Sequence, residues 1–207
     1  MSTITLNLST SPYGRQLYKT GIFEFMPGKT VLIGRNGAGK TTVLNLVEEY
    51  CKNNQIPYFK FDNYTKGGST ALQDYLFHGD FEGFVGGALH SEGEQIYNNL
   101  CNQSRKIGNF IRQHSDSKQI FILFDALDSG FDLDGFKQVN NLCDLILKDN
   151  SSIDVYLLIS ANNYGMVEGN PCYDVRSNQY VEICCYDDFK AFILKQYEDE
   201  RSKTGKI

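Results

Sequence analysis

Two patterns of apolar and polar positions alternate along the chain. Short runs of consecutive apolar residues are typical of strands that are covered on both faces of a largely parallel sheet. Such runs predict strands at residues 30–34, 57–61, 120–125 and 154–161. Between the runs, apolar residues recur at helical spacing, which predicts helices at residues 40–51, 94–112 and 136–147. The alternation predicts an α/β fold with a mostly parallel central sheet.

The two ends of the chain follow other patterns. The N-terminal end, up to the turn MPGKT, predicts an antiparallel β portion with strands at residues 4–8 and 21–25. The C-terminal end predicts a hairpin at residues 172–186, with its second strand at 180–186, and a closing helix at 187–201. We expect Asp187 or Asp188 to cap this helix.

The composition limits the classes of function. With 207 residues and 41% hydrophobic content, the chain can bury one substantial core, and we expect residues 1–207 to form a single domain. A formal net charge of −5 argues against a protein that mainly coats nucleic acid. The cysteines show no C-x-x-C spacing, which favours reduced core residues over a metal site. Because no apolar run is long enough to span a membrane and the N-terminus lacks the zones of a signal peptide, we expect a cytoplasmic protein without a membrane partner.

The strongest chemical signal is the segment GRNGAGKTT at residues 34–42, between an expected strand and an expected helix. A phosphate chain needs many backbone N–H donors without side chains in the way, which the three glycines permit, and the helix N-terminus adds its dipole. We expect Lys40 to reach the β- and γ-phosphates and the Thr41 hydroxyl to ligate Mg²⁺. The predicted nucleotide-binding residues of this segment are Gly34, Asn36, Gly37, Ala38, Gly39, Lys40, Thr41 and Thr42.

This segment and three others resemble, in kind and in order, the motifs of ABC-type ATPases. GRNGAGKTT has the asparagine before its second glycine that the P-loop of this family carries. HSEGEQ, at residues 90–95, resembles the signature LSGGQ, and more closely the S-x-G-E variant of the SMC and RecF-like branch. FILFD resembles the Walker B strand, DALDSGFD aligns with D-E-x-D-x-x-L-D at its aspartates, and ISAN takes the place of the switch segment. The resemblance runs from the MPGKT turn to about residue 165 and implies a P-loop NTPase fold of ABC-ATPase type.

The resemblance also implies that two ATP molecules are held with Mg²⁺ between two copies of the chain. Ser91, Gly93 and Glu94 would then face the γ-phosphate bound by the other copy, at the start of a helix whose dipole favours anions. Ser91 and Glu94 also fit a helix capping box, which is compatible with that role. The family places an aromatic ring from the first strands on the adenine, and Tyr13 and Tyr18 are the candidates.

The sequence departs from the family pattern where hydrolysis is catalysed. Asp125 is expected to hold Mg²⁺, as a Walker B aspartate does. The next position usually carries a glutamate that polarises the attacking water, but here it is Ala126, and Asn162 replaces the switch histidine. Since a positioned general base contributes roughly 10²–10⁴ in rate, we expect tight nucleotide binding with slow or partner-dependent hydrolysis. Asp128 or Asp132 is the candidate to orient water instead, although Asp128 also fits a turn cap. The predicted catalytic residues are Lys40, Asp125 and Asp128, and the predicted metal ligands are Thr41 and Asp125.

The span between the P-loop and the signature is short, which predicts a reduced helical lobe at about residues 63–115. This lobe is too small to grip a membrane partner as transporter subunits do, and it has no room for the coiled-coil arm of SMC proteins. The chain therefore resembles the small stand-alone ATPases encoded by phages, prophages and mobile elements. We expect a nucleotide-gated homodimer that acts on an unidentified protein partner. The alternatives are a non-hydrolysing regulatory module and a DNA-repair head, for which Arg105, Lys106 and Arg112 form a short basic stretch.

Overall fold

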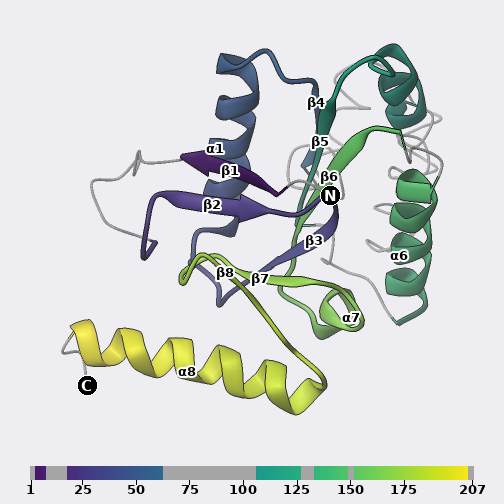
Figure 1. Ribbon diagram of the computed structural model, residues 1–207. Coiled ribbons are helices and arrows are strands. Elements are labelled where there is room, and N and C mark those ends of the chain that lie inside the picture. Colours follow the sequence, from purple (N-terminus) through teal and green to yellow (C-terminus); the bar gives the residue numbers. More distant parts are fainter. Residues whose placement is uncertain (1–2, 8–17, 63–105, 127–132, 149–151, 205–207) are drawn as a thin grey trace, which may run out of the picture.

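The computed structural model describes residues 3–7, 18–62, 106–126, 133–148 and 152–204. In these parts of the chain, six strands form a mostly parallel sheet in the order β4–β5–β6–β3–β7–β8, and β1 and β2 form a separate antiparallel pair (Figure 1). The strands are β1 (Ile4–Asn7), β2 (Ile22–Phe25), β3 (Gly28–Ile33), β4 (Tyr58–Asp62), β5 (Gln119–Asp125), β6 (Asp154–Ser160), β7 (Cys172–Asp174) and β8 (Gln179–Val181). The helices are α1 (Lys40–Asn53), α6 (Leu133–Lys148), α7 (Tyr164–Val167) and α8 (Tyr186–Thr204), with a further helical stretch at residues 106–113. The predicted α/β fold with a mostly parallel sheet is confirmed.

The described sheet brings the carboxyl ends of its five parallel strands, β4, β5, β6, β3 and β7, to one edge. β3 lies between β6 and β7 and is parallel to both. β5 is parallel to β6 on its other side. The carboxyl edge of a parallel sheet is where ligands of such folds bind, because the loops that follow the strands meet there.

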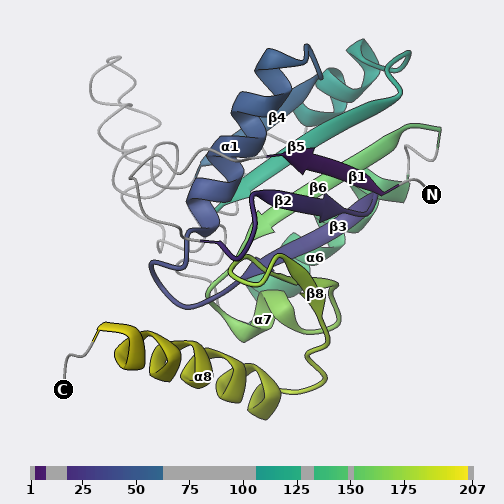
Figure 2. The ribbon, with the colours of Figure 1, turned by 60° about the vertical axis from the view of Figure 1, so that its left-hand side comes forward.

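Alternate residues of the central strands face two separate cores. On β3, Val31 and Ile33 belong to the core beneath α6 and α7, whereas Leu32 belongs to the core beneath α1 and the β1–β2 pair. Figure 1 shows α1 and α6 on opposite sides of the sheet, and α8 crosses below β8 and α7 in both ribbon views (Figure 2). Because both faces are covered, the strands are continuously apolar, which is the pattern seen in the sequence.

The C-terminal elements differ from the prediction. β8 ends at Val181 and α8 begins at Tyr186, so the strand predicted over residues 180–186 is wrong after Val181. The Asp188 carboxylate accepts the backbone N–H groups of Cys184 (3.1 Å) and Cys185 (3.2 Å). Asp188 therefore fixes the start of the helix from inside its first turn rather than from the N-cap position. The pattern did not predict α7, which is too short to show a helical period.

Some predicted elements fall outside the described residues. These are residue 8 of the first strand, residues 94–105 of the second helix and most of the predicted helical lobe. Within the described residues, no helix combines the length and the apolar character needed to cross a membrane.

Candidate functional site

A glycine-rich loop, residues 34–39, connects the end of β3 to the start of α1. Gly34 and Gly39 have φ values of 152° and 99°, in the region that favours glycine. A β-carbon on Gly34 would lie 2.8 Å from the Ala38 β-carbon, and one on Gly39 would lie 2.8 Å from the Tyr18 hydroxyl oxygen. The loop is therefore folded tightly on itself at the N-terminus of a long helix, where backbone N–H groups have no partner inside the helix and the dipole favours anions.

Tyr18 packs beneath this loop. Its hydroxyl donates to the Gly39 carbonyl at 2.9 Å, and its ring meets Phe23 edge-on with 5.1 Å between ring centroids. Burial raises the pKa of the Tyr18 phenol to about 12, although its hydrogen bond with Thr42 acts in the opposite direction. The residue is only 8% exposed, and its ring supports the loop from beneath. The base-stacking role of Tyr18 stays a prediction. Tyr13 lies outside the described residues.

Lys40 is the first residue of α1, and its side chain returns over the glycine-rich loop. Its ammonium group donates to the carbonyls of Gly34 (2.6 Å) and Arg35 (3.2 Å), and the residue is 7% exposed. Carbonyl oxygens satisfy a buried ammonium, but hydrogen bonds between oppositely charged groups are shorter and stronger. Phosphate oxygens are therefore better partners for Lys40 than the loop carbonyls.

Asp125 ends β5 and faces the start of α1. Its Oδ1 accepts a hydrogen bond from the Thr41 hydroxyl at 3.2 Å and a second one from the Ser160 hydroxyl at the end of β6. The Ser160 oxygen in turn accepts the backbone N–H of Ala126 at 2.9 Å. Asp125 and Ser160 are 2% and 3% exposed, so these contacts lie in the floor of the site.

A cleft of about 440 Å³ opens above these groups. Its described lining residues are Asn36, Gly37, Gly39, Lys40, Thr41, Thr42, Asp125, Ala126, Ser160 and Asn162. The lining combines backbone donors and an ammonium group, which suit an anion, with a carboxylate and hydroxyls, which suit a hard cation. Among the described residues, no group of three or more His, Cys, Asp or Glu side chains is placed to hold a metal, so an ion here would complete its shell with water and phosphate oxygens, as Mg²⁺ commonly does.

The cleft brings together about half of the site residues predicted from the sequence. Asn36, Gly37 and Gly39 of the glycine-rich loop line it together with Lys40, Thr41, Thr42 and Asp125, and Asn162 lies beside them. Gly34 and Ala38 belong to the loop but are not among the residues that line the cleft. Ser91, Gly93, Glu94 and Asp128 lie outside the described residues, so their roles stay predictions. Sequence reasoning missed Ser160. The available signal was a polar residue that ends a buried strand next to the strand that ends in Asp125, and using it requires knowing that β5 and β6 are neighbours.

The C-terminal helix α8 is hydrogen-bonded to the glycine-rich loop. The buried Gln196 side chain of α8 accepts the backbone N–H of Arg35 at 3.1 Å and donates to Asp174 at 2.9 Å. A second cavity of about 290 Å³ lies between α8 and the loop, and it shares Asn36 and Asn162 with the cleft.

Comparison with known proteins adds no family to this picture, since no protein-family model and no curated protein matches the chain.

Proposed function

We propose that this chain is an ABC-type ATPase with a P-loop NTPase fold, which binds ATP and Mg²⁺ and acts as a nucleotide-gated switch. The observation that carries the proposal is the path from β3 through the glycine-rich loop into α1, with Lys40 folded over the loop. In this proposal the nucleotide joins two copies of the chain, and the homodimer acts on a further protein partner.

Each group of the cleft has a part in the proposed binding. Backbone N–H groups of the loop and of the first turn of α1 would hold the phosphates, and Lys40 would exchange its carbonyl partners for β- and γ-phosphate oxygens. The Thr41 hydroxyl donates a hydrogen bond to Asp125, so the lone pairs of the Thr41 oxygen stay available for the metal. Bound Mg²⁺ would neutralise charge on the β- and γ-phosphates.

Slow hydrolysis follows from the residue after Asp125. Among the described residues that line the cleft, Asp125 alone carries a carboxylate, and it is engaged by two hydroxyl groups. Ala126 lines the cleft where the family has its glutamate, and Asn162 offers an amide where the family has a histidine. The cleft thus favours holding a nucleotide over cleaving it quickly, and Asp128 stays the predicted source of a second carboxylate.

The proposal is tested by measuring molar mass in solution with and without Mg-ATP, using light scattering after gel filtration. We expect the mass to double with Mg-ATP and to stay monomeric for Lys40→Ala. Lys195→Ala removes an exposed lysine from α8 and should behave as the unaltered chain. A mass that does not respond to saturating Mg-ATP would contradict the homodimer, and lack of ATP binding in calorimetry would contradict the whole proposal.

A non-hydrolysing regulatory module is the second candidate, and the absence of a side-chain base at Ala126 favours it. Phosphate release from Mg-ATP separates the two, with Lys40→Ala as the blank: release above the blank supports an ATPase, and release equal to it supports the module. A DNA-repair role is a weaker alternative. Lys106 and Arg112 are exposed on the helical stretch 106–113, and salt-sensitive binding of duplex DNA would support that role.

A further inference from the structure

Ser160 links the ends of two neighbouring strands. Its hydroxyl donates to Oδ1 of Asp125, and its oxygen accepts the N–H of Ala126 at 2.9 Å. Both contacts are buried, with Ser160 itself 3% exposed. A single side chain of β6 therefore contacts two consecutive residues at the end of β5, where the proposed metal site begins.

The direction of these hydrogen bonds is fixed by chemistry. A backbone N–H only donates, and a carboxylate only accepts. Because Ala126 supplies a proton to the Ser160 oxygen, the Ser160 proton has to point at Asp125. The Ser160 hydroxyl therefore has one defined orientation, unlike the hydroxyl of an exposed serine, which rotates among water molecules.

The same carboxylate oxygen also receives the Thr41 hydroxyl, at 3.2 Å. Among the described residues, Oδ2 of Asp125 accepts no hydrogen bond, whereas Oδ1 accepts two. Two donors on one oxygen define the rotation of the carboxylate group and keep the other oxygen for a ligand. The donors come from different elements, α1 and β6, so neither alone defines the plane of the carboxylate.

Ser160 also holds the backbone that follows Asp125. Ala126 has a φ of 53°, a left-handed conformation that is unfavourable for a residue with a β-carbon. The hydrogen bond from its N–H to Ser160 supports this conformation, and Ala126 is one of the residues that line the cleft.

We propose that Ser160 is a positioning residue of the carboxylate that would bind the metal: together with Thr41, it orients Asp125 so that the nucleotide complex takes up Mg²⁺ at low concentration. The inference rests on the proposed function, because it concerns the metal that accompanies the nucleotide. Groups that orient a metal ligand through a hydrogen bond typically change metal affinity 10- to 100-fold when they are removed.

The test is a titration of ATP binding with Mg²⁺, using the intact chain, Ser160→Ala and Ser160→Thr. ATP affinity in EDTA should be the same for all three, because Asp125 then has no ion to hold. The Mg²⁺ concentration that gives half of the gain in ATP affinity should rise about 10- to 100-fold for Ser160→Ala. Ser160→Thr keeps the hydroxyl and should stay within about threefold of the unaltered chain.

Two outcomes would overturn the inference while the proposed function stands. One is an unshifted Mg²⁺ titration for Ser160→Ala, and the other is an equal loss of ATP affinity with and without Mg²⁺ in a folded Ser160→Ala chain. If Ser160→Ala does not fold, as judged by thermal unfolding, Ser160→Cys decides, since its weak S–H donor should shift the titration in the same direction. Failure of the unaltered chain to bind ATP in any condition would overturn the proposed function, and the inference with it.

Discussion

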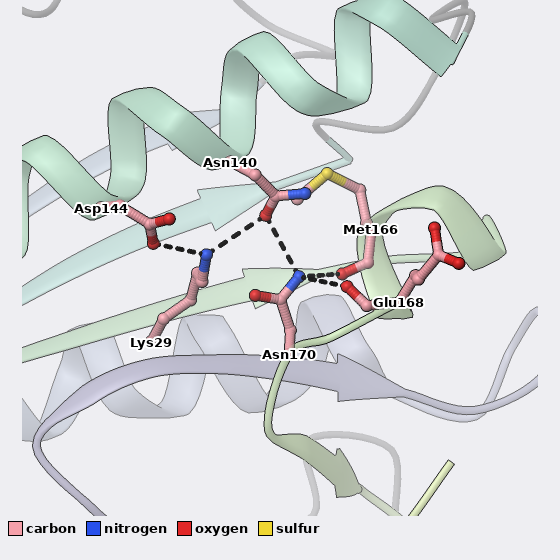
Figure 3. Close-up of polar contacts among 6 residues, drawn as sticks. All are labelled: Lys29, Asn140, Asp144, Met166, Glu168 and Asn170. Atoms are coloured by element: carbon pink, nitrogen blue, oxygen red, sulfur yellow. Dashed lines mark hydrogen bonds and ion pairs between the residues drawn. The ribbon is translucent and has the colours of Figure 1, made fainter. Parts of the chain in front are cut away.

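One lysine lies near the entry of β3 and another follows its exit, across the glycine-rich loop, and the two lysines have different surroundings. Lys29, near the entry of the strand, donates to the Asp144 carboxylate at 2.7 Å and to the Asn140 side chain at 3.3 Å (Figure 3). Lys40, after the exit of the strand, donates to the carbonyls of the glycine-rich loop and lies in the wall of the cleft. A carboxylate partner ties a lysine to the fold, whereas carbonyl partners are ones that a phosphate can replace.

The surroundings of Lys29 are typical of a structural cluster. The Asn170 amide donates to Asn140 at 3.1 Å and to the carbonyls of Met166 and Glu168 at 2.9 and 3.3 Å (Figure 3). These contacts join α6 and the turn after α7 to the strand that leads into the glycine-rich loop. The entry end of β3 thus fastens helices to the sheet, and the exit end presents polar groups to a cleft.

The largest expected effect concerns the cleft at the exit end of β3, where the substitution Ala126→Glu tests whether a missing base limits the rate of ATP hydrolysis. Ala126→Glu extends a carboxylate from a side chain that already lines the cleft, so hydrolysis of Mg-ATP should rise roughly 10²–10⁴-fold in single-turnover assays. Ala126→Gln is the matched control, because it has the same size without a base. Equal rates for the two variants would show that the missing carboxylate is not what limits hydrolysis.

Lys40→Ala tests whether the exit lysine acts on a ligand and not on stability. Since it would remove the charge-assisted contacts with the β- and γ-phosphates that we propose for this lysine, ATP should bind about 100-fold more weakly in calorimetry. The midpoint of urea unfolding should change little, because the lost hydrogen bonds are to loop carbonyls. A chain that unfolds at much lower urea but binds ATP normally would reverse the roles of the two ends of β3.

The exit end was largely predictable from the sequence, because its requirements are local. The loop needs glycines at fixed positions, and Asp125 follows directly on a buried strand. The rest depends on contacts between distant segments. Ser160 acts only because β6 lies beside β5, and Tyr18 is enclosed because Phe23 and the loop close over it.

The contacts at the entry end of β3 were not predictable either, because they too join segments that are distant in the sequence. Lys29 and Asp144 are far apart in the sequence, and a lysine in a strand carries no local sign of its partner. The mistaken end of β8 has a related cause. The residues after Val181 suit a strand by their pattern, but the Asp188 carboxylate draws their backbone N–H groups into the start of α8.

Lys29→Met tests whether the entry lysine acts on stability alone. Its side chain is 10% exposed, while that of Asp144 is 62% exposed and stays hydrated when the partner is lost. The free energy of unfolding should therefore fall by only about 1–2 kcal/mol, measured by urea unfolding with an unchanged slope. ATP affinity should stay within about twofold. Lys118→Met, at an exposed lysine, should cost less than about 0.5 kcal/mol, and a tenfold loss of ATP affinity in Lys29→Met would show that the entry end is not purely structural.

The smallest expected effect concerns Glu48 and its two lysine partners, which lie at neither end of β3. Glu48 of α1 contacts Lys60 of β4 and Lys52 at 2.8 and 2.7 Å. Burial alone would raise its pKa, but the hydrogen bonds and charges of the two lysines outweigh burial and hold the pKa of Glu48 below its ordinary value. A depressed pKa stabilises the fold above the unfolded-state value of about 4.3, and this contribution is lost as the pH falls through the folded-state pKa.

Glu48→Gln should accordingly lower the free energy of unfolding by less than about 1 kcal/mol at pH 7, because the pair is partly exposed. The difference between the two proteins should shrink as the pH falls below about 4, since the carboxyl group of the unaltered chain then becomes neutral as well. Urea unfolding at a series of pH values measures it. A difference that stays constant down to low pH would mean that the glutamine changes packing between α1 and β4, and that charge has no part in this contact.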